Sequence, residues 1–247
     1  GAFEGCSSLT QISFPSSLIS IGNRAFIECS SLTQVSFDVL SSTTSIGHKA
    51  FYGCASLAKI LIPSSIISIG EQIFEICQSL TEMSFDIPSS VTSIGNYSFV
   101  KCSSLTQISI PSSVTLIGDF SFVKCSSLTQ IFLPSSITTI NNGVFEGCSS
   151  LAQISIPSSV TSIGSNAFHQ CSSLVQISIP LSVIEIGNSA FRECSSLTQI
   201  TIPSSVTEIK YNVFDNCSSL KQVLIPTSIT SIGDYAFREC SSLTQIS

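Results

Sequence analysis

The sequence predicts an α/β repeat solenoid, a continuous stack of similar coils that each contribute one short strand. Eleven cysteines recur from Cys6 to Cys240, with eight gaps of 23 residues and two of 25. Each cysteine follows a phenylalanine by three residues, from Phe3 to Phe237. A strict period of this length is typical of stacked supersecondary units. We therefore expect residues 1–247 to form one solenoid of nearly eleven coils. Both ends fall within a coil and show no polar cap, which predicts a fragment of a longer array.

The coil from Leu151 to Ser173 shows the elements in order. Its segment Gln153-Ile154-Ser155-Ile156 alternates polar and apolar residues, which predicts a short half-buried strand. Pro157 ends the strand, because proline cannot donate the next ladder hydrogen bond. Residues 160–163 form a second extended stretch whose apolar side chains turn inward, and Gly164 then breaks the chain.

The second half of the coil predicts a helical turn. Ala167, Phe168 and Cys171 have spacings that can share one side of a short helix. A single coil cannot bury its apolar positions alone, so the coils must stack. At the strand spacing of about 4.8 Å, the stack forms a rod or arc on the order of 50 Å long.

These motifs carry a family resemblance over the whole chain. Leu-x-x-Ile-x-Ile at residues 151–156 and Ile-Gly-x-x-Ala-Phe-x-x-Cys at residues 163–171 resemble the BspA-like class of leucine-rich repeats. The resemblance implies a leucine-rich-repeat arc with a parallel β-sheet on the concave face and short helical turns on the convex face. It also implies a phenylalanine spine beneath the convex face.

The cysteine column has three interpretations. The first is a small buried hydrophobic residue that recurs because the coil recurs. The second is a disulfide framework, since stacked cysteines lie about 5 Å apart; against it, eleven is odd and side chains in register point the same way. The third, a metal site, lacks a Cys-x-x-Cys or Cys-His cluster. Unpaired thiols are unusual in an oxidising compartment, which bears on location.

Composition excludes two classes of partner. The net charge is −6 and only 10% of residues are charged, well below the roughly 25% of ordinary domains. Nucleic acid binding requires a basic patch, and docking on an anionic membrane requires a cationic surface. No apolar run approaches the ~20 residues that span a bilayer. We therefore expect neither nucleic acid binding nor membrane insertion by these residues.

Two coils carry a two-residue insertion, Asp38-Val39 and Asp86-Ile87, where the strand turns outward. They are interpreted either as harmless surface bulges or as protrusions that flank a ligand site. At the glycine position, Asn141 and Lys210 replace the usual residue. We therefore expect only mild backbone demands there.

The outward strand positions are mostly Gln and Ser, and a few coils depart from this rule. The candidate partner-contact residues are Lys59, Leu61, Glu82, Phe132 and Leu224. Isolated exposed apolar residues are normal on protein surfaces, which is the alternative interpretation. An aromatic side chain on a polar sheet is nevertheless a plausible contact anchor. Charges on the helical side are interpreted as a solvated face; these are Glu28, Lys101, Lys124, Glu146, Arg192, Glu193, Arg238 and Glu239.

No pattern predicts catalysis, a cofactor or a metal. His48 and His169 occupy different coil positions, without a recurring carboxylate that would orient an acid–base site. No nucleophile elbow or phosphate-binding glycine loop occurs.

The preferred function is a non-enzymatic binding module. The resemblance implies a BspA-like surface protein that adheres to partner proteins or to extracellular matrix, with a cell-surface or extracellular location. One alternative is an intracellular, cytoplasmic scaffold or regulatory protein, favoured by the free thiols. Another is a structural spacer without a specific ligand, favoured by the near-identity of the coils. End-to-end self-association is also expected, because uncapped ends expose strand edges.

Overall fold

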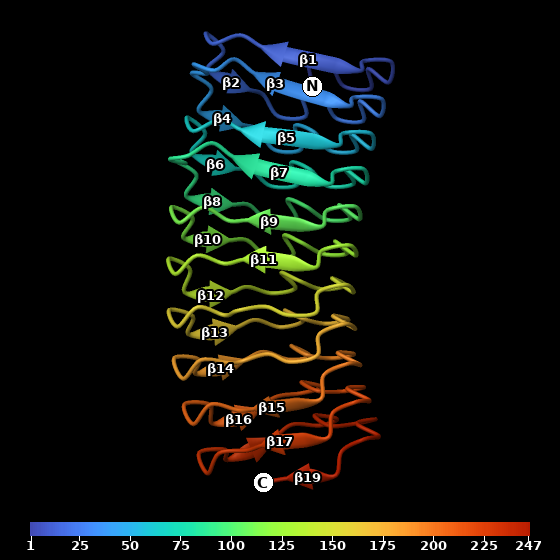
Figure 1. Cartoon of the computed structure of the whole chain (residues 1–247), viewed down its shortest axis with the longest axis vertical. Helices are drawn as coiled ribbons and strands as arrows, with labels where there is room; N and C mark the ends of the chain where they lie inside the picture. Colours follow the sequence, from blue (N-terminus) through green and yellow to red (C-terminus); the bar gives the residue numbers. More distant parts are fainter.

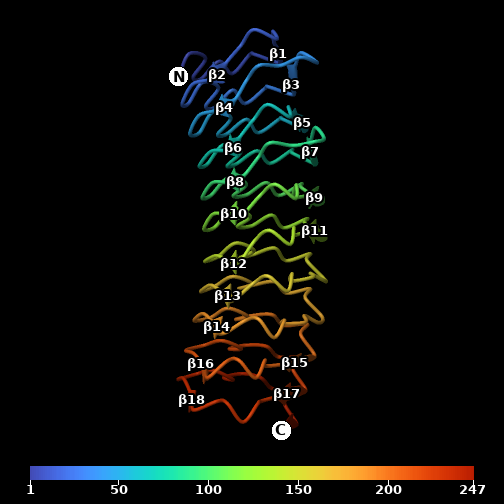
Figure 2. The ribbon, with the colours of Figure 1, turned by 90° about the vertical axis from the view of Figure 1, so that its left-hand side faces the viewer.

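The computed structural model, which describes residues 1–247, is a parallel-strand solenoid of leucine-rich-repeat type with about ten turns (Figure 1). Most turns contribute one strand to each of two columns, which Figure 2 shows on opposite sides of the stack. The first column is β1 (Gln11–Phe14), β3 (Gln34–Phe37), β5 (Lys59–Ile62), β7 (Glu82–Phe85), β9 (Gln107–Ser109), β11 (Gln130–Phe132), β15 (Gln199–Thr201), β17 (Gln222–Leu224) and β19 (Gln245–Ile246). The second is β2 (Ser20–Ile21), β4 (Ser45–Ile46), β6 (Ser68–Ile69), β8 (Ser93–Ile94), β10 (Leu116–Ile117), β12 (Thr139–Ile140), β13 (Ser162–Ile163), β14 (Glu185–Ile186), β16 (Glu208–Ile209) and β18 (Ser231–Ile232).

The outward side of the first column is called the strand face here. Its strands pair in parallel, and the register is one repeat, as in Gln199 beside Gln222 and Thr201 beside Leu224. Alternation along each strand turns Ile200 into the core and leaves its two neighbours outside. The strand face therefore carries columns of side chains with the same identity.

A continuous hydrophobic core of 67 buried residues runs the length of the stack. Its centre is the phenylalanine spine: consecutive rings from Phe3 to Phe237 stack with centroids 5.0 to 5.9 Å apart. Nine of these phenylalanines, from Phe26 to Phe214, are fully buried. This confirms the spine that the sequence resemblance implied.

The prediction of helical turns is wrong, because the segment from Gly164 to Cys171 and its equivalents form turns without a helix. The N–H groups of Phe168 and Gln170 donate to carbonyls of the next coil at 2.8 Å. Those of His169 and Cys171 donate three residues back within the coil. A helix would need every N–H to point to residue i−4. The alternation instead places Asn166 and Gln170 in the left-handed region, at φ 56° and 60°. The outer surface of these turns is called the turn face here.

The stack is a nearly straight column in both ribbon views (Figures 1 and 2), so the expected arc with a concave sheet is not pronounced. The turn face is joined from coil to coil by backbone hydrogen bonds along the whole stack, and the strand face along most of it.

The glycine position has a steric rather than a conformational requirement. Gly164 does not adopt a left-handed φ, as expected, but a Cβ there would lie 2.7 Å from the backbone of Asn141 in the preceding coil. The coils therefore approach closely at this point. Asn141 is itself accommodated through a 2.7 Å hydrogen bond from its amide to the carbonyl of Ile117.

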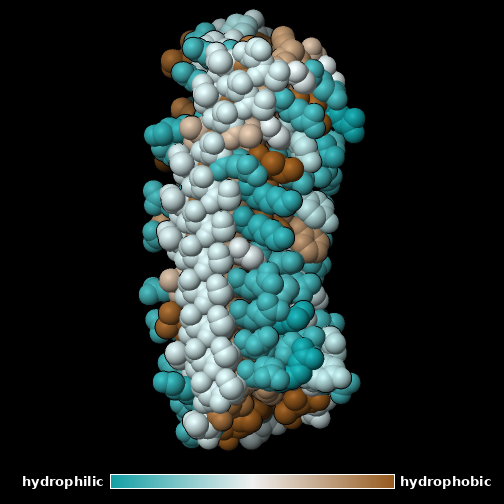
Figure 3. Space-filling model, turned by 90° about the vertical axis from the view of Figure 1, so that its right-hand side faces the viewer, coloured by the Kyte–Doolittle hydropathy of each residue, from teal (hydrophilic) through white to brown (hydrophobic).

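One side of the rod is formed by the Cys-Ser-Ser-Leu segments that precede the first-column strands. This side is polar but only weakly hydrophilic. Figure 3 shows it as a continuous pale column bordered by hydrophilic residues. This agrees with a composition in which serine and threonine replace charged residues.

Candidate functional site on the strand face

All five sequence-predicted contact residues lie on the strand face, in two separate grooves. Leu61, Phe132 and Leu224 expose 48%, 54% and 41% of their surface, although most large apolar residues of the chain are buried. Lys59 and Glu82 occupy the Gln position of adjacent strands and form an ion pair at 2.7 Å. The pair is exposed, so it contributes about 0 to 1 kcal/mol to stability. Because Lys59 and Glu82 are one repeat apart, this ion pair could have been predicted from the sequence.

The larger groove, called the Phe132 groove here, has a volume of about 1180 Å³. Phe132 and Leu224 stand at its two ends, and both occupy the outward Ser position of their coils. Between them lie Ser155, Ser178 and Thr201 at the equivalent position of three successive coils. A parallel column of glutamines forms one wall. No charged side chain lines the groove.

The strand ladder is interrupted at this groove. The segments 153–156 and 176–179 have strand-like sequences but are not regular strands, and only an isolated bridge between Ser155 and Ser178 joins them. No backbone hydrogen bond connects residues 130–133 to 153–156, or 176–179 to 199–202. The coils of this region are held together on the turn face instead.

The interruption opens the core slightly to the groove floor. The inward-facing Ile154 and Ile177 are each 8% exposed, compared with 2% for Ile108 in the regular ladder. This opening could not be predicted from the sequence, because residues 153–156 and 176–179 have the same strand motif as residues 107–110.

The smaller groove, called the Lys59 groove here, has a volume of about 570 Å³ and contains Lys59, Leu61 and Glu82. The insertions predicted to protrude follow β3 and β7, which pair with β5 on either side. Their side chains Val39 and Ile87 are 94% and 93% exposed. The Lys59 and Leu61 replacements on β5 and the two insertions after its neighbouring strands thus lie on three adjacent coils. Whether they bind a partner stays a prediction.

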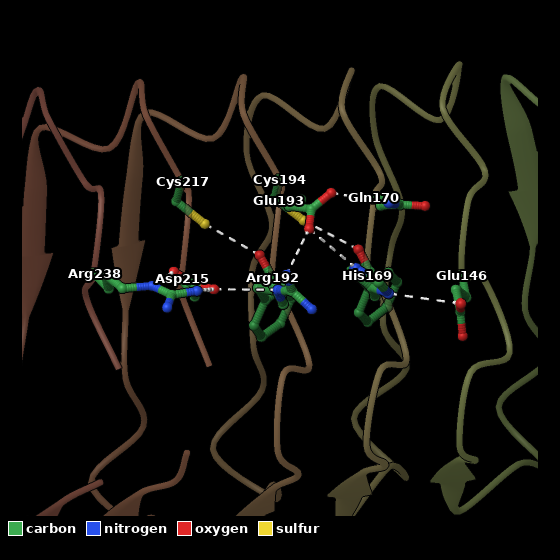
Figure 4. A network of polar contacts seen from close by, with 11 residues as sticks. Glu146, His169, Gln170, Arg192, Glu193, Cys194, Asp215, Cys217 and Arg238 are labelled. Carbon is green, nitrogen blue, oxygen red and sulfur yellow. Dashed lines mark hydrogen bonds and ion pairs between the residues drawn. The ribbon is translucent and has the colours of Figure 1, made fainter. Parts of the chain in front are cut away.

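A row of charged side chains crosses the turn face, one coil after another (Figure 4). Asp215 is fully buried and accepts hydrogen bonds from Arg238 at 2.7 and 2.8 Å and from Arg192 at 3.1 Å. The hydrogen bond from Arg238 lowers the pKa of Asp215 below its ordinary value, against the opposing effect of burial. Glu193 accepts from Gln170 at 2.9 Å, which lowers its pKa as well.

The expectation of a wholly solvated charged side is therefore corrected. His169 was also expected to lack an organised carboxylate, yet its two ring nitrogens lie 3.6 Å from Glu146 and from Glu193. Glu146 and Glu193 are 23 residues before and 24 residues after His169, so the repeat spacing was the available signal. The row joins neighbouring coils and presents no nucleophile beside the imidazole.

The cysteine column is structural in this chain. All eleven cysteines are free, and every one except Cys6 is buried. Each buried thiol donates to the carbonyl of the spine phenylalanine one coil earlier, as Cys171 does to Phe145 at 3.2 Å. Burial raises the pKa of Cys54 to about 12 and that of Cys240 to about 11. These thiols are protonated at neutral pH and serve as hydrogen-bond donors.

The chain holds no group of three or more His, Cys, Asp or Glu side chains arranged to bind a metal ion. None of its segments forms a helix of the length and apolarity needed to cross a bilayer.

Comparison with known proteins finds similarity to one class of repeat protein. The model of the BspA type leucine rich repeat region matches residues 1–86, 83–183 and 161–247. A leucine-rich repeat protein from Bacteroides ovatus is 28% identical with a TM-score of 0.80, over 95% of this chain and 74% of that one. A leucine rich cell surface protein from Faecalibacterium prausnitzii is 29% identical with a TM-score of 0.56, over 96% and 78%. The leucine rich repeat protein of T. pallidum is 31% identical with a TM-score of 0.62, over 76% and 84%. No curated protein matches the chain in sequence.

Proposed function

Because the chain belongs to the BspA-type leucine-rich repeat family, whose fold is a protein-interaction module, we propose that it is an adhesion module. It acts without enzymatic activity, and it binds partner proteins or extracellular matrix through the strand face. The observation that carries this proposal is the placement of Leu61, Phe132 and Leu224. All three break a polar repeat, all three are exposed, and all three line grooves on one face.

The chemistry of the strand face fits protein contact. Interface anchors are apolar or aromatic side chains surrounded by polar groups that exclude water. Phe132 and Leu224 stand among glutamine and serine side chains that both donate and accept hydrogen bonds. The identical coils offer the same polar contacts repeatedly, which favours multivalent binding to a repetitive partner.

A cell-surface location is part of the proposal. The Faecalibacterium prausnitzii neighbour is described as a cell surface protein, and it aligns over most of both chains. The second candidate is an intracellular scaffold, which the eleven free thiols favour. Antibody labelling of intact and permeabilised cells separates the two. Labelling only after permeabilisation would favour the scaffold.

The strand-face proposal is tested with the triple variant Leu61→Ser, Phe132→Ser, Leu224→Ser. The purified protein is captured on beads, and bead adhesion to matrix-coated surfaces is measured. Loss of three anchors is expected to reduce adhesion at least tenfold. The matched control is Ile67→Ser, Leu181→Ser, Ile184→Ser, which removes three exposed apolar residues outside both grooves. Control adhesion is expected to equal that of the unaltered protein.

Adhesion that is insensitive to the strand-face variant would contradict the proposal. If neither the unaltered protein nor the variants adhere to any matrix or protein surface, the structural spacer becomes the better account.

A further inference from the structure

We infer that the Phe132 groove binds an uncharged, extended polypeptide segment that lies along the rod, with apolar side chains about six residues apart contacting Phe132 and Leu224. This inference rests on the proposed function and names the occupant of that face. Three features of the groove carry it: its charge, the separation of its two anchors, and the apolar character of its floor.

The lining of the groove determines the charge of its occupant. The groove contains glutamine, serine and threonine side chains but no acidic or basic residue. A charged group of a partner would lose water there without gaining a counterion, which is unfavourable. An uncharged segment with amide and hydroxyl groups is matched by the glutamine column, which supplies donors and acceptors at every coil.

The anchors determine the length of the occupant. Phe132 and Leu224 are 92 residues apart, which is four repeats of 23. Four strand spacings amount to about 19 Å along the rod. Six residues of extended polypeptide span about 20 Å, and residues i and i+6 point to the same side. One extended segment can therefore place an apolar side chain on each anchor at once.

The floor favours polypeptide over carbohydrate. Sugars stack on aromatic rings, but Leu224 offers no ring and the floor contains Ile154 and Ile177. Aliphatic anchors are matched by aliphatic side chains of a peptide. These two isoleucines are each 8% exposed, which is more than Ile108, Ile131 or Ile200 in the regular strands.

The test titrates capped, uncharged seven-residue peptides into the 247-residue protein and follows its backbone amide shifts by NMR. The probe has leucine at the first and seventh positions and Ser, Thr and Gln between them. One comparison peptide has leucine at the first and fifth positions, and another has lysine at the third, which points to the same side as the two leucines. The probe is expected to shift amides of residues 153–156 and 176–179 and to bind more tightly than both comparisons.

Protein variants provide the second arm. Phe132→Ser and Leu224→Ser are each expected to weaken probe binding on the order of tenfold. Leu61→Ser, in the other groove, is expected to leave it unchanged. Unaltered amide spectra confirm that each variant is folded.

Two results would overturn the inference. The first is that none of the three peptides binds, or that all three bind equally. The second is that a neutral β-linked hexasaccharide binds in a Phe132-dependent manner and the peptides do not. If the peptides fail while the strand-face variant still loses adhesion, the peptide inference falls and the proposed function stands. If adhesion is insensitive to that variant, the proposed function falls as well.

Discussion

Asp215 shows at the residue scale how one side chain can join three coils. Its carboxylate is fully buried, and Arg192 and Arg238 approach it from the coils on either side. The two guanidinium groups replace the water that burial removes. The residue therefore belongs to the cohesion of the stack, and its role could not be assigned from a list of charged positions.

The free energy contributed by Asp215 is expected to depend on pH. Its pKa is lowered in the folded state from an ordinary value of 3.8, so the ionised form stabilises the fold at pH values above about 4. This contribution is lost as the pH falls through the folded-state pKa. Asp215→Asn is expected to lower the free energy of unfolding by about 2 kcal/mol at pH 7 and by much less at pH 2. Urea unfolding at several pH values measures the difference.

The control for this prediction is Asp234→Asn, which alters an exposed aspartate and is expected to change stability by less than about 0.5 kcal/mol. A deficit of Asp215→Asn that is the same at pH 2 and pH 7 would show that packing, and not charge, accounts for the role of Asp215.

The exposure of a residue that breaks a column could be predicted from the sequence. Phe132 and Leu224 replace the usual serine of their column, and strand alternation turns that position outward. The carboxylates beside His169 could not be predicted in this way. They can be predicted only when side chains one repeat apart are treated as neighbours, as Glu146 and His169 are.

At the scale of the element, the turn differs most from its prediction. Ala167, Phe168 and Cys171 have a spacing that suits a helix and also suits a turn with alternating left-handed residues. The inter-coil hydrogen bonds that decide between them are invisible within one repeat. Some signal existed: Gly143 and Gly147, both at positive φ, occupy the positions that Asn166 and Gln170 hold one coil later.

The buried cysteine column makes a prediction for the same element. Ten thiols are buried donors, and burial raises their pKa values, to well above the ordinary value for Cys77 and Cys171. Because the thiolate is the reactive species, these thiols are expected to be inert in the folded protein. A colorimetric thiol reagent at pH 8 should detect one fast-reacting thiol, Cys6, and eleven after unfolding in guanidinium. Several fast thiols in the folded protein would contradict the column of hydrogen bonds to the spine carbonyls.

At the scale of the whole molecule, the period predicted the stack and its core, while curvature and the grooves needed the structure. Nothing in the motif of residues 153–156 distinguishes it from that of residues 107–110, yet only the latter includes a regular strand. The difference therefore lies outside the four-residue motif. Such a property belongs to the array and is absent from any single repeat.

The interrupted ladder is expected to appear in hydrogen exchange along the rod. Apart from the isolated bridge between Ser155 and Ser178, amides of residues 153–156 and 176–179 lack an inter-coil backbone acceptor, so they should exchange at least tenfold faster than those of β9. On the turn face of these coils, the N–H groups of Phe168 and Gln170 donate to the next coil at 2.8 Å and should remain protected. This contrast would show that the strand face opens locally while the coils stay joined behind it. Uniform protection of both faces would instead mean that the ladder is continuous in solution, and the Phe132 groove would lose its accessible isoleucine floor.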